Sequence, residues 1–93
     1  MTLLFESNAG TITVPNAVLV GIAVRAAETV EGVHVRRRRA VDLEANTVRL
    51  TIAASRGEPL VEVGERAQEE VASALKTMCG LDVTVDVMIG ELR

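Results

Sequence analysis

Aromatic side chains are nearly absent from this 93-residue chain, which contains one Phe, no Trp and no Tyr. Proteins that hold single-stranded nucleic acid stack its bases on aromatic rings, and cages for quaternary ammonium groups are built from the same rings. Most small-molecule pockets also use aromatic walls. The scarcity of rings therefore argues against these kinds of site, and it predicts a core of aliphatic side chains.

Cysteine and histidine are equally scarce, with one residue of each type. Cys79 has no second cysteine for an intramolecular disulfide, which fits a reducing compartment, and we interpret it as a small buried hydrophobe, with a reactive thiol as the alternative. His34 has no second histidine and no nearby cysteine, so neither a metal site nor a Ser–His relay is expected. We expect no metal, no cofactor and no catalytic residue, and hence a protein that is not an enzyme.

A long apolar run is also missing. A membrane-spanning helix needs roughly 20 apolar residues, whereas the longest apolar run, residues 17–24, is much shorter and contains Gly21. The first residues lack a basic group and include Glu6, which is unlike a secretory signal. We therefore expect a cytoplasmic protein with no transmembrane segment of its own, which reaches the inner face of the cell membrane only through a partner.

The composition is that of one small globular domain. Hydrophobic residues make up 48% of the chain and charged residues 25%, and cores divide into separate domains only in much longer chains. We expect a single domain over residues 1–93, with its core in residues 10–90 and a short N-terminal extension at 1–9.

Two segments have the apolar spacing of amphipathic helices. The first follows Pro15, a residue suited to the first turn of a helix, and we expect Gly32 to end it. The second covers residues 60–79, ends at Gly80, and contains Gly64, which we interpret as a point of close approach to a neighbouring element. The apolar positions are Val18, Leu19, Ile22, Ala23, Ala26, Ala27 and Val30 in the first segment, and Val63, Ala67, Val71, Ala74, Leu75 and Met78 in the second.

The remaining segments have the alternation of strands. A brief strand is expected at 11–14, a hairpin from 33–43 and 48–52 with a polar corner at 44–46, and a last strand at 81–89. The order β-α-β-β-α-β predicts an α+β fold, a two-layer sandwich with two helices packed on one face of a small mixed or antiparallel sheet. Strand order is left open, and a ferredoxin-like arrangement is one compatible choice.

Charge is unevenly distributed along a chain whose net charge is −3. Residues 1–56 carry seven basic and five acidic side chains, and residues 57–93 carry three and eight. Four of the basic residues form one run: Arg36, Arg37, Arg38 and Arg39. An uninterrupted strand would point two of them toward the core, so we expect a bulge or an overhang there.

The arginine run Arg36–Arg39 is the candidate partner-binding site. It is either a solvated loop or a contact for an anionic partner such as an acidic protein surface, a phospholipid layer or nucleic-acid phosphate. Nucleic acid is disfavoured by the net negative charge. The acidic face expected at residues 62–70 offers another partner, because the arginines of one copy meeting these acids in the next would build head-to-tail polymers.

Several short segments resemble the alkaline shock protein 23 family, bacterial proteins of the cell-envelope stress response. They are Gly-Thr-Ile-Thr-Val-Pro at 10–15, Val-Glu-Gly-Val at 30–33, Gly57, Val-Gly-Glu-Arg-Ala-Gln-Glu-Glu-Val at 63–71, and Met-Cys-Gly-Leu-Asp-Val at 78–83. The resemblance covers roughly residues 10–90. The chain departs from the family pattern at four places: Val14 replaces a serine, Arg56 an aromatic residue, Val61 a proline and Cys79 a threonine.

The resemblance implies a non-enzymatic interaction module of the envelope-stress type. Such a protein self-associates and is recruited to the membrane by a small integral membrane protein. The alternative is a small protein that binds an anionic polymer, nucleic acid or acidic lipid, through the arginine run.

Overall fold

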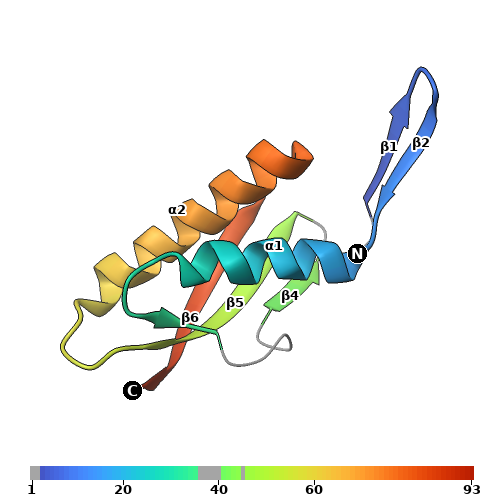
Figure 1. Ribbon diagram of the computed structural model, residues 1–93. Helices are drawn as coiled ribbons and strands as arrows, with labels where there is room; N and C mark the ends of the chain where they lie inside the picture. The colour runs from blue at the N-terminus through green and yellow to red at the C-terminus, as the bar shows by residue number, and fades with distance from the viewer. Residues whose placement is uncertain (1–2, 36–40, 45) are drawn as a thin grey trace.

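The computed structural model describes residues 3–35, 41–44 and 46–93, without the side chains of residues 3, 5 and 7. These residues form two helices and six strands (Figure 1). In chain order they are β1 (Leu3–Ser7), β2 (Gly10–Val14), α1 (Asn16–Glu28), β3 (Val33–His34), β4 (Val41–Glu44), β5 (Thr47–Ala54), α2 (Leu60–Cys79) and β6 (Thr84–Leu92).

The main sheet is mixed, with β5 at its centre. Both β3 and β4 pair antiparallel with β5, β4 along its first half and β3 at its end. Strand β6 pairs with β5 in parallel, and a register shift after Ile52 leaves Gly90 without a partner. The crossover through α2 is what makes a parallel neighbour of β5 reachable. The expected sheet, mixed or antiparallel, is thus the mixed one.

Both helices cover the same face of this sheet, which confirms the expected two-layer α+β sandwich (Figure 1). The helices run side by side, with α1 over β3 and β4 and α2 over β6. The core between the layers is aliphatic, as the composition predicts. Its largest fully buried side chains are Leu19, Leu50, Ile52, Leu75, Val48, Val63 and Val71.

The glycines near the helix ends behave in two ways. Gly80 ends α2, as predicted, and is its left-handed cap with φ +67°; its N–H donates to the carbonyl of Lys76 at 2.9 Å. The prediction for Gly32 is wrong, because α1 ends at Glu28 and Gly32, at φ +85°, belongs to the turn before β3. The interpretation of Gly64 is also wrong, since a Cβ there would meet nothing within 4 Å.

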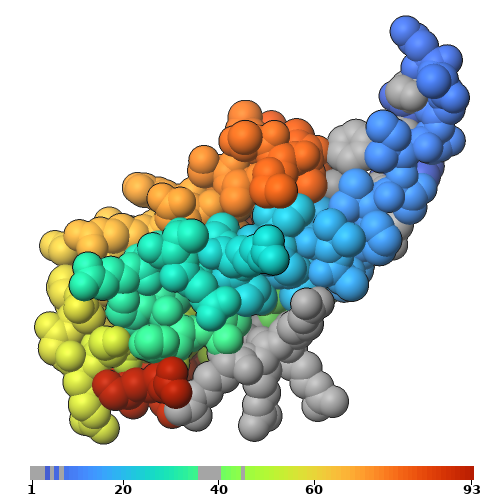
Figure 2. Space-filling model, viewed as in Figure 1, coloured from blue at the N-terminus to red at the C-terminus, as the bar shows by residue number. Residues whose placement is uncertain are grey.

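The N-terminal strands form a separate hairpin, which differs from the predicted order. Strand β2 covers the expected strand at 11–14, but it pairs with β1 and not with the main sheet. The hairpin stands clear of the body beyond the first turn of α1 (Figures 1 and 2). The molecule is therefore elongated, 51 × 20 × 19 Å, with a Cα radius of gyration of 13.8 Å, against about 12 Å for a compact chain of this length.

Candidate functional site: the groove between the helices

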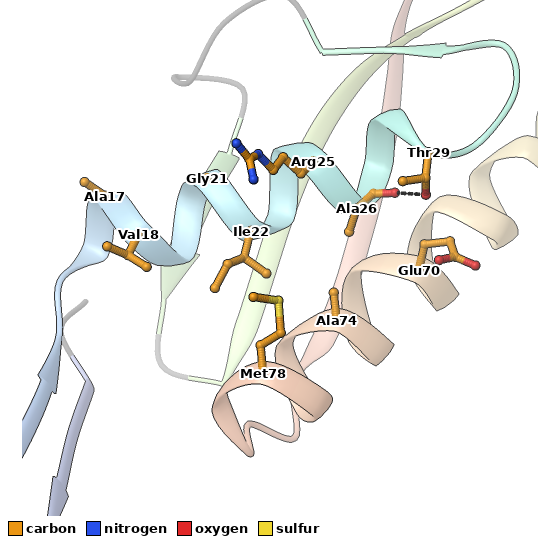
Figure 3. A pocket seen from close by; sticks show the side chains of 10 residues that line it. All are labelled: Ala17, Val18, Gly21, Ile22, Arg25, Ala26, Thr29, Glu70, Ala74 and Met78. Carbon is orange, nitrogen blue, oxygen red and sulfur yellow. Dashed lines mark hydrogen bonds between the residues drawn. The ribbon is translucent and has the colours of Figure 1, made fainter.

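An open apolar groove of about 680 Å³ runs between α1 and α2, whose ribbons lie in front of the strands of the sheet in Figure 3. Most of its lining residues come from α1, where positions three and four apart share one face of the helix. The small Ala and Gly residues in its lining leave the space between the helices open. The lining residues are Ala17, Val18, Gly21, Ile22, Arg25 and Ala26 of α1, its C-cap Thr29, and Glu70, Ala74 and Met78 of α2.

The walls of this interhelical groove are aliphatic and accessible. Met78 and Ala74 reach from α2 toward α1, where Ile22 points back at them (Figure 3). The exposed fraction is 67% for Met78 and 49% for Val18. A thioether side chain has three rotatable bonds and adapts to the shape of what it touches. Covering these side chains with a partner would remove aliphatic surface from water.

Polar groups lie toward the opposite end of the groove. The hydroxyl of Thr29 donates a hydrogen bond of 2.6 Å to the carbonyl of Ala26, so its proton is already used within the helix. Beyond it a second hollow of about 390 Å³ is bordered by Glu31, Arg66 and Glu69. The interhelical groove is therefore apolar near the start of α1, and charged groups of both signs lie toward the end of α1.

The chemistry of the groove fits a protein segment better than a small molecule. Its volume lies in the range of ligand pockets, but such pockets fix a ligand with several convergent polar groups and enclose most of its surface. Here the groove is open, and its exposed walls come from Val18 and Met78, with Ile22 half-buried. Burial of aliphatic side chains is what this surface offers a partner.

The apolar spacing of the two helices predicts that Val18 and Met78 belong to the core, and this prediction is wrong. Val18 and Met78 have the helical spacing of core residues, yet both are exposed. Val18 lies in the first turn of α1 and Met78 in the last turn of α2, where the two helices leave an open trough. Spacing alone finds the apolar face of a helix, and it does not show where the opposing layer ends.

The predicted partner site, Arg36–Arg39, lies outside the described residues. Of the two single residues weighed for chemistry, Cys79 is buried as a small hydrophobe, at 7% exposed. His34 is half-buried on β3, with its Nε2 3.3 Å from the hydroxyl of Ser55. The structure brings neither into the groove.

The acidic outer face of α2 is exposed as predicted, and its charges are partly balanced. Arg66 lies 3.9 Å from Glu62 one turn away, an exposed pair that contributes little to stability. Past the end of α2, the ammonium of Lys76 donates to Asp82 at 2.7 Å. Asp82 lies in the expected last strand at 81–89, but it precedes β6, which begins at Thr84, and it bonds to the helix.

The face of the sheet opposite the helices is a second accessible surface, with a hollow of about 460 Å³. Its centre is Arg49, which the register places between Asp42 of β4 and Asp86 of β6. The Arg49 guanidinium also lies 3.6 Å from Glu44. Opposite charges on neighbouring strands attract one another within the sheet. This surface is therefore a weaker candidate for a partner contact than the groove is.

Among residues 3–35, 41–44 and 46–93, no group of three or more His, Cys, Asp or Glu residues could hold a metal ion. Within the same residues, neither helix is both long enough and apolar enough to cross a membrane.

The chain matches no family model, no curated protein and no solved structure. The resemblance to the alkaline shock protein 23 family therefore stays a prediction that depends on the sequence segments alone.

Proposed function

We propose that this protein is a non-enzymatic interaction module that self-associates and is brought to a membrane by a partner protein. The observation that carries the proposal is the interhelical groove, where Val18 and Met78 expose aliphatic surface on a chain of 93 residues. Contact with a partner would remove these aliphatic side chains from water, which is favourable. The occupant for which the chain itself gives an argument is a second copy.

The membrane part of the proposal has separate support. It comes from the resemblance at residues 10–15, 30–33 and 63–83 to a family whose members work at the cell envelope. Recruitment by an integral protein is also consistent with the absence of a spanning helix among the described residues. This part of the proposal stands or falls independently of self-association.

Sedimentation equilibrium of the full chain tests self-association. Because the chain contains no Trp or Tyr, concentration is followed by refractive index. The average mass should rise above the monomer's 9.9 kDa between about 1 and about 100 µM protein. A mass that stays at 9.9 kDa over the whole range would contradict this half of the proposal.

Flotation tests the membrane half. The protein should float with membranes from cells that make it, and it should stay at the bottom of the gradient with protein-free vesicles of the same lipids. Protease treatment of the membranes beforehand should abolish flotation. Binding to protein-free acidic vesicles that weakens steeply with salt would instead support the alternative function, contact of the arginine run with an anionic layer.

A further inference from the structure

The N-terminal hairpin, β1 and β2, has no extensive contact with any other described element. It joins the body through Pro15 and points away from it (Figure 1). A single two-stranded hairpin is at best marginally stable in water, and it needs a third strand or a helix to pack against. No other described element of the same chain gives the hairpin an extensive surface to pack against.

One face of the hairpin is suited to such packing. Ile12 and Val14 alternate with Thr11 and Thr13, so the two apolar residues of β2 share a face. Ile12 is 55% exposed. The register pairs these residues with Phe5 and Leu3, which are also apolar residue types. On this Ile12 face, Ile12 is the exposed side chain of β2, while Val14 is partly buried against the core of its own chain.

The interhelical groove matches the hairpin in length and chemistry. Each strand of the hairpin has five residues, which extend over about 17 Å. The groove follows α1 from Ala17 to Thr29, a rise of about 18 Å. The exposed Ile12 and the groove walls Val18 and Met78 are aliphatic. Arg25, Thr29 and Glu70 are the polar residues that also line the groove.

We infer that the hairpin of one copy packs its Ile12 face into the interhelical groove of a second copy, and that the exchange is reciprocal. The inference rests on the proposed self-association and names its surface. The hairpin leaves the body beside Ala17 and Val18, where the groove begins. Two copies can be placed with the starts of their α1 helices side by side and the helices pointing in opposite directions. Each hairpin then lies over the other copy's groove, around a two-fold axis.

Reciprocity follows from what each arrangement leaves uncovered. A head-to-tail chain of copies always ends in one unpacked hairpin and one open groove. A two-fold dimer covers both hairpins and both grooves with two copies, and it is closed to further growth. The expected species is therefore a dimer of about 20 kDa.

Paired substitutions test each side of the contact. Ile12→Glu places a charge on the docking face of the hairpin, and Thr13→Glu places the same charge on its other face. Met78→Glu does so in the groove, and Thr77→Glu is its neighbour outside the lining. All four positions are exposed, so the core stays intact, which circular dichroism and thermal unfolding verify.

In sedimentation equilibrium, Ile12→Glu and Met78→Glu should each raise the dimer dissociation constant by roughly 1,000-fold. Loss of one buried anchor weakens a contact by about 30-fold, and each substitution occurs twice in a reciprocal dimer. Thr13→Glu and Thr77→Glu should change the constant by less than about threefold. Equal effects of test and control variants, or none, would overturn the inference.

Hydrogen exchange gives a readout that a merely local effect would not move. In the parent dimer, amides of residues 3–14 should be protected, and dilution should remove the protection. Met78→Glu, although it lies in α2, should remove it at every concentration, whereas Thr77→Glu should preserve it. Unchanged protection in a monomeric Met78→Glu protein would mean that the hairpin is stable alone or packs within its own chain, and would overturn the inference.

The remaining outcomes separate this inference from the proposed function. An oligomer that persists in both Ile12→Glu and Met78→Glu leaves self-association standing and overturns the hairpin contact. A parent chain that remains a monomer overturns self-association and the contact together. A mass that grows without limit with concentration, and is abolished by the same variants, overturns the reciprocal form.

Discussion

At the scale of single residues, an aliphatic core makes stability depend on tight packing of branched side chains. Leu75 of α2 is fully buried. Leu75→Ala should lower the free energy of unfolding by about 2–5 kcal/mol, because it removes buried methyl groups and leaves a cavity. Urea unfolding at fixed protein concentration measures the change. Val61→Ala, on the same helix but 75% exposed, should change it by less than about 0.5 kcal/mol, and equal effects of the two would contradict this packing.

Two glycines of the same helix should respond to alanine with opposite signs. Gly80 has φ +67°, so Gly80→Ala should cost about 1–2 kcal/mol in backbone strain. Gly64 is inside α2, and a Cβ there meets nothing within 4 Å, so Gly64→Ala should raise stability by about 0.5–1 kcal/mol. Thermal unfolding of both variants checks this. A stabilising Gly80→Ala or a destabilising Gly64→Ala would contradict the assigned backbone conformations.

At the scale of elements, the apolar periods predicted both helices and most of the sheet. Val85, Val87 and Ile89 alternate with exposed residues in β6, as the pattern requires. The first strand was assigned to the wrong sheet, because alternation shows that a segment is extended and does not show what it pairs with. The signal for the hairpin was present in the turn, where Asn8 and Gly10 are residue types that favour reversal of the chain.

The candidate site was less predictable than the fold. Helical spacing found the apolar faces that line the groove, but whether Val18 and Met78 face a core or solvent depends on how far the two helices overlap. That overlap is set by contacts between residues far apart in the sequence. The arginine run was conspicuous because four like charges are adjacent, a local property that needs no fold to be recognised.

The place of β5 in the sheet predicts an order of local stability. Among the described strands, β5 is the one with partners along both edges. Its amides should therefore exchange most slowly, with opening free energies near the global value, while β4 and β6 exchange faster from their open edges. Native-state hydrogen exchange with fragment analysis measures this order. Faster exchange in β5 than in β6 would contradict the central position.

At the scale of the whole molecule, the salt dependence of the mass distinguishes two modes of self-association, one aliphatic and one held by charge. In the reciprocal dimer the contact is aliphatic, so it should persist from about 0.05 to about 1 M NaCl, where the Debye length falls to about 3 Å. A head-to-tail polymer held by Arg36–Arg39 against the acidic face of α2, Glu62–Glu70, would dissociate over the same range.

Replacing all four arginines of the run by Gln provides the matched control. The quadruple variant should retain the parent's dimer constant within about threefold, because the groove and the hairpin face contain none of these residues. Sedimentation equilibrium at both salt concentrations, for the parent, the quadruple variant and Met78→Glu, measures the two modes together. The groove interface would be contradicted if salt and the quadruple substitution dissociated the oligomer while Met78→Glu behaved as the parent. The interface would then involve the arginine run.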